Sequence, residues 1–227
     1  MRLLAIDTAL DACAACVFNT EGGLSLASES LTMARGHAEA LMPLVARVMD
    51  KAAISFAQVD RIAVTVGPGS FTGLRVGISA ARGIALAAGK PAVGISTLAA
   101  YAAPHIARED AAQIVVAIDA KHHNVYLQVF GSAGRTVLAP QIASVRDAVR
   151  AAREGPARIV GSGAGLISAD WPAGEAPPLL VDPTGAPSIE WVARLGAAAR
   201  NTDVSPKPLY LRAPDARPQD DARLPRR

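Results

Sequence analysis

The chain has 227 residues, 51% of them hydrophobic, and a formal net charge of +3 at pH 7. This length and apolar fraction exclude an intrinsically disordered chain and suit one large domain or two small lobes. The small basic excess sits mostly near the end of the chain, so charge alone indicates no nucleic-acid-binding surface. Asp7 interrupts the first apolar run, and no run is long enough to cross a membrane. We therefore expect a cytoplasmic protein with no signal peptide and no membrane contact.

The first hundred residues have the pattern of an α/β unit. Short apolar segments separated by turn residues, such as Glu21-Gly22-Gly23, predict strands, and longer periodic segments predict helices. The predicted elements in chain order are strands at 2–7, 14–19 and 24–31, a helix at 37–53, a strand at 61–66, a helix at 72–88 and a strand at 91–95. The order is βββαβαβ.

The second half repeats the first. Ala-Ile-Asp at 5–7 recurs at 117–119, and Val-Phe at 17–18 recurs at 129–130, each pair being 112 residues apart. The copy continues more loosely with a helix at 144–152, a strand at 157–161 and a helix at 187–200. Two lobes of one design are the simplest explanation.

The boundary between the lobes is expected near 103–112, where Pro104 and a charged run interrupt the apolar pattern. We therefore predict an N-terminal lobe at 1–104, a second and smaller lobe at 105–212, and a tail at 213–227. The N-terminal lobe is expected to carry the helices used for dimerisation.

The two cysteines, Cys13 and Cys16, form a C-x-x-C pair within a predicted strand. An odd spacing in a strand directs two side chains to opposite faces, so we interpret both as small packing residues. A zinc site would need two further ligands, and the sequence offers no second C-x-x-C pair.

The segment GPGSFTGLRVG, at 67–77, joins a predicted strand to a predicted helix. It is not a Walker A loop, because no lysine followed by Ser or Thr closes it. The glycines favour a tight turn and close packing. The alternative is an anion contact at the helix N-terminus through Gly67, Gly69, Ser70 and Thr72, although Ser70 or Thr72 could instead cap the helix.

The helices at 37–53 and 72–88 are apolar around most of their circumference. Polar residues such as Arg47 and Lys51 occupy one strip of the first, and Arg75, Ser79 and Arg82 form a narrow line on the second. Because a helix on its own sheet buries one face, such helices need a second cover. We predict a partner protein there; the alternative is that the two helices cover each other and the second lobe.

The predicted partner interface contains His37, Ala40, Leu41, Leu44, Val48, Gly73, Leu74, Gly77, Ile78 and Ala81. A bulky residue in place of Gly77 is expected to break the pairing while the monomer stays folded.

Four motifs together closely resemble the TsaB (YeaZ) family: HAEALMP at 37–43, GPGSFTGLRVG at 67–77, IDAKHHNVY at 118–126 and PLYLR at 208–212. The likeness spans nearly the whole chain. With Ile-Asp-Thr at 6–8, the paired lobes also resemble the actin, sugar kinase and Hsp70 (ASKHA) superfamily. The resemblance implies an α/β fold of two RNase H-like βββαβαβ lobes in tandem, the second degenerate. Lys121 is a departure, since the family usually has arginine there.

The resemblance further implies a noncatalytic dimerisation subunit for the synthesis of threonylcarbamoyladenosine (t6A) in tRNAs that read ANN codons. The catalytic subunit TsaD transfers the threonylcarbamoyl group to N6 of adenosine 37. TsaD and the ATPase TsaE are the implied partners, and a homodimer is implied when the chain is alone. tRNA is expected to be held mainly by TsaD. No intrinsic cofactor is expected, and ATP or ADP would lie at most at a seam between subunits.

The competing hypothesis is an ATP-dependent small-molecule kinase. Asp7 and Thr8 occupy the place where kinases of the superfamily keep a carboxylate near magnesium, and Asp119 repeats Asp7 in the second lobe. Such a kinase would hold ATP with these residues and the glycine-rich stretches at 67–73 and 161–165.

Metal chemistry and peptidase activity are not expected. Catalytic relatives carry two histidines one helical turn apart, where this chain has Thr97 and Tyr101. His122 and His123 are adjacent and do not share one face, and His37 is expected at a helix start. We predict no catalytic residue and no metal site.

Overall fold

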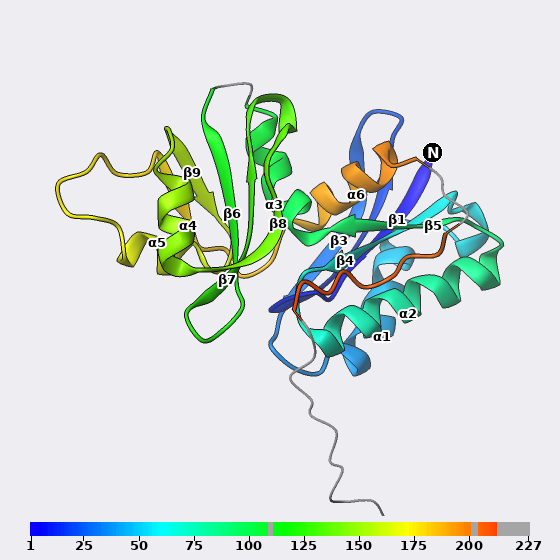
Figure 1. Ribbon diagram of the computed structural model, residues 1–227. Coiled ribbons are helices and arrows are strands. Elements are labelled where there is room, and N and C mark those ends of the chain that lie inside the picture. The colour runs from blue at the N-terminus through cyan, green and yellow to red at the C-terminus, as the bar shows by residue number, and fades with distance from the viewer. Residues whose placement is uncertain (109–110, 201–203, 213–227) are drawn as a thin grey trace, which may run out of the picture.

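The computed structural model describes residues 1–108, 111–200 and 204–212, and the predicted tail at 213–227 lies outside the described residues. The chain forms two five-stranded sheets, each with helices on both faces (Figure 1). The strand orders are β3-β2-β1-β4-β5 and β10-β9-β6-β7-β8. In each sheet three antiparallel strands are extended by two parallel ones. The predicted α/β fold is confirmed.

The strands are β1 Arg2–Asp7, β2 Ala12–Asn19, β3 Leu24–Thr32, β4 Arg61–Gly67, β5 Ala92–Ser96, β6 Gln113–Asp119, β7 Asn124–Phe130, β8 Thr136–Ser144, β9 Ala157–Val160 and β10 Leu180–Asp182. The α-helices are α1 His37–Lys51, α2 Phe71–Ala88, α3 Thr97–Ile106, α4 Val145–Ala152, α5 Ala164–Ala169 and α6 Ile189–Ala198. Two short 3-10 helices, η1 Phe56–Gln58 and η2 Ser132–Gly134, complete the described elements.

The repeat read from the sequence is present in the fold. The bounds of β3, Leu24–Thr32, and of β8, Thr136–Ser144, are offset by 112 residues at both ends. When the strands of each repeat are numbered from one, both sheets have the strand order 3-2-1-4-5. Gly67 and Gly161, which lie at the ends of equivalent strands, both have a positive φ, of 109° and 104°. Such backbone is readily accessible to glycine, which has no Cβ.

Both faces of the first sheet are buried. Leu4 and Ile6 of β1 pack with α1 and α2, whereas Leu3 and Ala5 of the same strand pack with α6. This follows from the alternation of side chains along a strand. Since β1 is covered twice, its sequence is an almost continuous apolar run.

The cysteines behave as predicted. Cys13 packs in the cluster beneath α1 and α2, and Cys16 packs in the cluster beneath α6, so the two thiols lie on opposite faces. Both are free and buried. Burial raises the pKa of each thiol to about 11, which keeps both protonated at neutral pH.

The last helix of each repeat covers the sheet of the other repeat. α3 contributes Leu98 and Tyr101 to a cluster with β6, and α6 contributes Ile189 and Val192 to a cluster with β1, β2 and β4. The two helices also contact each other, so they form the layer between the sheets. α3 was not predicted from the sequence, although Ser96 caps it by accepting a hydrogen bond from the Ala99 N–H.

The C-terminal described segment also returns to the first lobe. Residues 204–212 run alongside α2 (Figure 1), and the Leu209 N–H donates to the Val66 carbonyl at 2.7 Å. Residues 105–212 were predicted to form one lobe. This prediction is corrected, because α6 and this segment pack on the N-terminal lobe. The apolar face of a helix does not encode which of two sheets it will cover.

Candidate functional site

The residues predicted for the partner interface face inward. All of them except Ala40, which is half-buried, are buried in the monomer. Leu41, Leu44 and Leu74 belong to the same core cluster as the strands of the first sheet. The residue-level prediction is wrong because the buried side of each helix faces its own sheet. His37 does begin α1, as expected, and its Nε2 lies 3.0 Å from the Leu10 carbonyl.

Part of the outer surface of α1 and α2 is nevertheless apolar. Met42 and Phe71 are each 47% exposed and Leu86 is 86% exposed. An apolar groove of about 520 Å³ lies between the helices and η1. The residues that line this groove are Met42, Phe56, Ala57, Ala80, Gly83, Ile84, Ala87 and Ala88. Exposed apolar surface of this kind marks an interaction site more often than an isolated exposed leucine does.

The two glycines on α2 have opposite roles. A Cβ added at Gly77 would come within 3.0 Å of the Thr8 hydroxyl oxygen, whereas a Cβ added at Gly83 would meet nothing within 4 Å. Gly77 therefore lets α2 approach β1, and a bulky residue there would disturb the monomer itself. A bulky substitution at Gly77 therefore cannot distinguish loss of pairing from loss of folding. A substitution at Gly83 can.

Charged residues of α1 form ion pairs with β3. Glu29 of β3 forms ion pairs with Arg47 and Lys51 of α1, at 2.5 and 3.1 Å. Hydrogen bonds from these two side chains lower the pKa of Glu29 to about 2. Glu29 balances one of these two positive charges, and none of the three residues lines the groove.

The glycine loop at 67–77 packs against the protein's own backbone. A Cβ at Gly69 would come within 3.0 Å of the Ala9 carbonyl, and a Cβ at Gly73 would do the same to the Thr8 carbonyl. The Ala9 carbonyl accepts the Ser70 N–H at 2.7 Å, and the Ser70 hydroxyl caps the Gly73 N–H. The Ser70 and Gly73 N–H groups are thus used within the protein, which agrees with the close-packing interpretation.

The second glycine-rich stretch, at 161–165, is packed in the same way. A Cβ at Gly161 would lie 2.5 Å from the Ala117 carbonyl, and one at Gly163 would lie 3.2 Å from the Asp119 nitrogen. The Gly163 N–H also donates to the Ala117 carbonyl. Both loops therefore use glycine for close approach to the first strand of their repeat.

Asp7 lies at the end of β1 and is fully buried. Its Oδ1 accepts hydrogen bonds from Thr65 Oγ1 at 2.5 Å and from the Ala9 N–H at 2.9 Å, while its Oδ2 has no hydrogen-bond partner. Burial raises the pKa of Asp7 against the lowering effect of those two hydrogen bonds. Thr8 donates its hydroxyl to the Gly73 carbonyl at 2.7 Å, so it ties β1 to α2.

A cavity of about 340 Å³ lies between the lobes, lined by Asp11, Ser70, Asp119, Lys121 and Ser162 among others. Lys121 forms an ion pair with Asp119 at 2.9 Å, so its ammonium group is engaged within the lobe. Burial acts to raise the pKa of Asp119, but the hydrogen bonds and charge of Lys121 lower it overall. Asp7 does not line this cavity, and the geometry does not favour the kinase hypothesis.

Among the described residues, no group of three or more His, Cys, Asp or Glu is placed to hold a metal ion. Thr97 and Tyr101 are both buried, and the Tyr101 hydroxyl donates to the Thr184 carbonyl at 2.9 Å. Within the same described ranges, no helix has both the length and the apolar character that a bilayer span needs.

Comparison with known proteins identifies the family of the chain. A family model described as TsaD, tRNA N6-adenosine threonylcarbamoyltransferase, matches residues 30–169. The tRNA threonylcarbamoyladenosine biosynthesis protein TsaB of Haemophilus influenzae is 32% identical over 174 residues, which are 72% of each chain. The chain belongs to the TsaB (YeaZ) family.

Two further TsaB-family relatives agree with this assignment. The TsaB protein of Escherichia coli is 37% identical over 126 residues, and the chain spans only 53% of that protein's length in the match. The solved structure of YeaZ from Pseudomonas aeruginosa has a TM-score of 0.73 at 29% identity, covering 92% of this chain and 99% of that one. The tandem arrangement is therefore shared with a solved TsaB-family structure over almost its full length.

Proposed function

We propose that the chain acts in t6A biosynthesis as a noncatalytic subunit that pairs with other proteins through the outer faces of α1 and α2. The observation that carries the proposal is the apolar groove around Gly83, bordered by Met42, Phe56 and Ile84. Removing the exposed parts of Met42 and Phe56 from water on pairing supplies a favourable free energy, which is less than the about 1.5–3 kcal/mol for full burial of one large apolar side chain, because both are already partly buried. The names of the TsaB relatives give the biosynthetic process.

The partners in this proposal follow from the family. The catalytic TsaD subunit, which transfers the threonylcarbamoyl group to N6 of adenosine 37, occupies the helix face in the working complex, and a second copy of this chain occupies it when TsaD is absent. The ATPase TsaE joins the complex, and ATP or ADP binds at a seam between subunits. The complex works on cytoplasmic tRNAs that read ANN codons.

Contacts within the candidate nucleotide site support the noncatalytic role. Backbone carbonyls of Thr8 and Ala9 lie against the glycines of one loop, and Lys121 is held by Asp119. The purified chain alone is expected to release no ADP from ATP above background. Turnover by the chain alone that is lost in Asp7→Asn would favour the kinase alternative.

Gly83→Leu tests the pairing face. A Cβ at this position meets no atom of the monomer within 4 Å, so we expect the monomer to stay folded while the added bulk beside the groove excludes the partner. We expect loss of the dimer in light scattering after size exclusion, loss of co-purification with TsaD, and loss of t6A when the variant replaces the native chain in cells.

The matched control is Gly165→Leu on α5, because Gly165 is also exposed and a Cβ there likewise meets nothing within 4 Å. This variant should retain the dimer, TsaD binding and t6A. A Gly83→Leu chain that still pairs with TsaD at native affinity would overturn the proposed face.

A further inference from the structure

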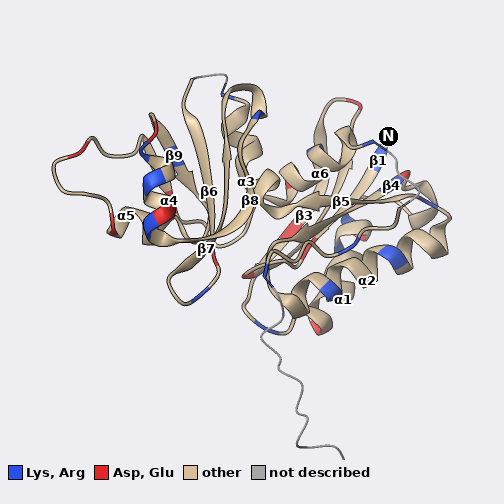
Figure 2. Ribbon diagram, viewed as in Figure 1, with Lys and Arg blue, Asp and Glu red and all other residues tan. Residues whose placement is uncertain are grey.

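One side of α2, together with the C-terminal segment beside it, is uniformly basic. The stretches 71–92 and 204–212 contain five charged residues, all of them positive: Arg75, Arg82, Lys90, Lys207 and Arg212. Figure 2 shows basic bands and no acidic band along α2. Net charge elsewhere is nearly balanced, so this is a local concentration of positive charge.

Within the described ranges, four of these side chains form no ion pair, unlike several cations elsewhere in the fold. Arg47, Lys51 and Lys121 each pair with a carboxylate, as do Arg150 and Arg153. In the described part of the chain, Arg75, Arg82, Lys90 and Lys207 form no ion pair. Their charge is therefore available to an anionic ligand. We call Phe71, Arg75, Arg82, Lys90, Lys207 and Tyr210 the basic strip.

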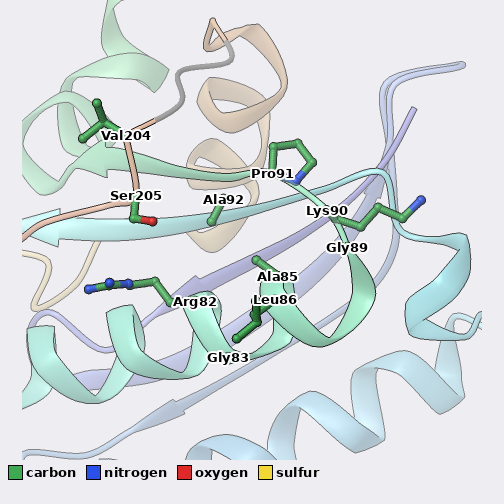
Figure 3. A pocket seen from close by; sticks show the side chains of 10 residues that line it. All are labelled: Arg82, Gly83, Ala85, Leu86, Gly89, Lys90, Pro91, Ala92, Val204 and Ser205. Carbon is green, nitrogen blue, oxygen red and sulfur yellow. The ribbon is translucent and has the colours of Figure 1, made fainter.

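A hollow runs along this strip. A cavity of about 710 Å³ is lined by Arg82, Leu86, Lys90 and Ser205 among others, and the side chains of Arg82 and Lys90 extend in opposite directions at its two ends (Figure 3). α2 ends here, and two of its last four carbonyls are satisfied, because Lys90 donates its N–H to the Ala85 carbonyl and Gly89 donates its N–H to the Leu86 carbonyl. The helix terminus therefore presents few free acceptors to an anion.

The other end of the strip carries an exposed aromatic pair. Phe71 and Tyr210 are 47% and 45% exposed and stack with centroids 5.5 Å apart. The Arg75 guanidinium lies 3.7 Å from the Phe71 ring centroid, and its Nε donates to the Tyr210 hydroxyl at 3.2 Å. Guanidinium planes and aromatic rings are the groups on which proteins stack unpaired bases.

This inference rests on the proposed function. Together with that function, the positive charge and the aromatic pair favour one class of ligand. We propose that the basic strip binds RNA directly, with Arg75, Arg82, Lys90 and Lys207 on the phosphate backbone and one unstacked base against Phe71 and Tyr210. An acidic peptide or an anionic membrane would use the charges but not the aromatic pair. The tRNA substrate would then be held by this chain as well as by the catalytic subunit.

The strip and the pairing groove lie on different sides of α2. Residues 75, 82 and 86 fall on one line of the helix at 3.6 residues per turn, whereas Ala80, Ile84 and Ala87 of the groove fall about a third to a half of a turn away. Gly83 lines both the groove and the hollow, whereas Arg75, Arg82 and Lys207 do not line the groove, so charge reversal in the strip leaves the groove residues unchanged.

The test compares two triple variants of equal net charge. Arg75→Glu/Arg82→Glu/Lys207→Glu reverses the strip, and Arg108→Glu/Arg135→Glu/Arg146→Glu reverses three exposed arginines elsewhere. Binding of an unmodified tRNA transcript to each full-length chain is measured between about 50 and 200 mM salt. The strip variant should bind at least about ten-fold more weakly. Its slope of log affinity against log salt concentration should be less steep by about two to three. The control should bind nearly as the native chain does.

Tyr210→Ala separates RNA from other polyanions. We expect about ten-fold weaker tRNA binding and unchanged binding of heparin or of vesicles rich in phosphatidylserine. Equal loss in both triple variants, or loss of all polyanions alike in Tyr210→Ala, would overturn the inference. Co-purification of the strip variant with TsaD should persist, so failure here is distinguishable from failure of the pairing face.

Discussion

Asp7 is a buried acid with an incomplete set of hydrogen bonds. One carboxylate oxygen accepts from Thr65 and Ala9, and the other has no partner among the described residues. A buried charge in this position costs free energy, and for that reason burial raises the pKa of Asp7 above its ordinary value of 3.8. The side chain is therefore a source of pH-dependent stability.

The sign of this dependence follows from linkage. Because the folded-state pKa is raised, the contribution of Asp7 is fully present below the pKa of the unfolded chain and is lost as the pH rises through the folded pKa. Asp7→Asn keeps an acceptor for Thr65 and Ala9 but cannot ionise. We expect the variant to be more stable than the native chain at pH 7, by about 1–3 kcal/mol, and to lose this advantage in acid.

Urea unfolding at a series of pH values measures this difference. Asp11→Asn, at an exposed neighbouring position, is the control and should leave the pH dependence unchanged. The interpretation fails if Asp7→Asn and the native chain show parallel stability curves from acid to neutral pH.

α2 performs three tasks on three sides. Leu74 and Ile78 pack on the first sheet, Ile84 and Ala87 line the groove, and Arg75 and Arg82 lie beside the C-terminal segment. The helix is slim enough to do this because Gly77 lets its backbone approach Thr8 closely. Gly83 has no comparable neighbour, so its missing side chain shapes only the outer surface.

The same substitution at these two glycines should have opposite effects. Gly77→Ala places a methyl group against the Thr8 hydroxyl and should lower the free energy of unfolding by about 1–3 kcal/mol. Gly83→Ala adds a methyl group in open space and should raise it by up to about 1 kcal/mol through helix propensity. Urea midpoints of the two variants decide the matter, and a stabilised Gly77→Ala chain would contradict the packing argument.

At the scale of the whole molecule, the exchange of α3 and α6 makes the two lobes interdependent. A lobe without the helix of its neighbour would expose Leu3, Phe18 and Val93 on one sheet, or Ile114, Val116 and Phe130 on the other. Arg61 strengthens the connection, since its guanidinium donates to the Gly196 and Ala199 carbonyls at the end of α6.

We therefore expect that neither half folds alone. Fragments 1–108 and 111–212, expressed separately, should lack cooperative unfolding and dispersed NMR spectra, and expressed together they should form a native-like complex. A fragment 1–108 that unfolds cooperatively at the midpoint of the full chain would show that α6 is dispensable to the first lobe.

Several levels of the structure could be read from the sequence because they depend on local pattern. Strand periodicity and the 112-residue repeat predicted both sheets, and the odd spacing of Cys13 and Cys16 placed their thiols on opposite faces. The glycines at 69 and 73 indicated close packing, because side-chain-free positions at a strand-to-helix corner have that steric meaning regardless of what the neighbour is.

The sequence by itself determined the family, the α/β class and the tandem repeat. Only the tertiary structure decided which face of α1 and α2 is outward and which sheet each of α3 and α6 covers. The physical reason is that hydrophobic attraction is non-directional. A helix rich in alanine and glycine has several faces apolar enough to be buried, and its choice depends on which sheet and which backbone carbonyls the rest of the chain brings near.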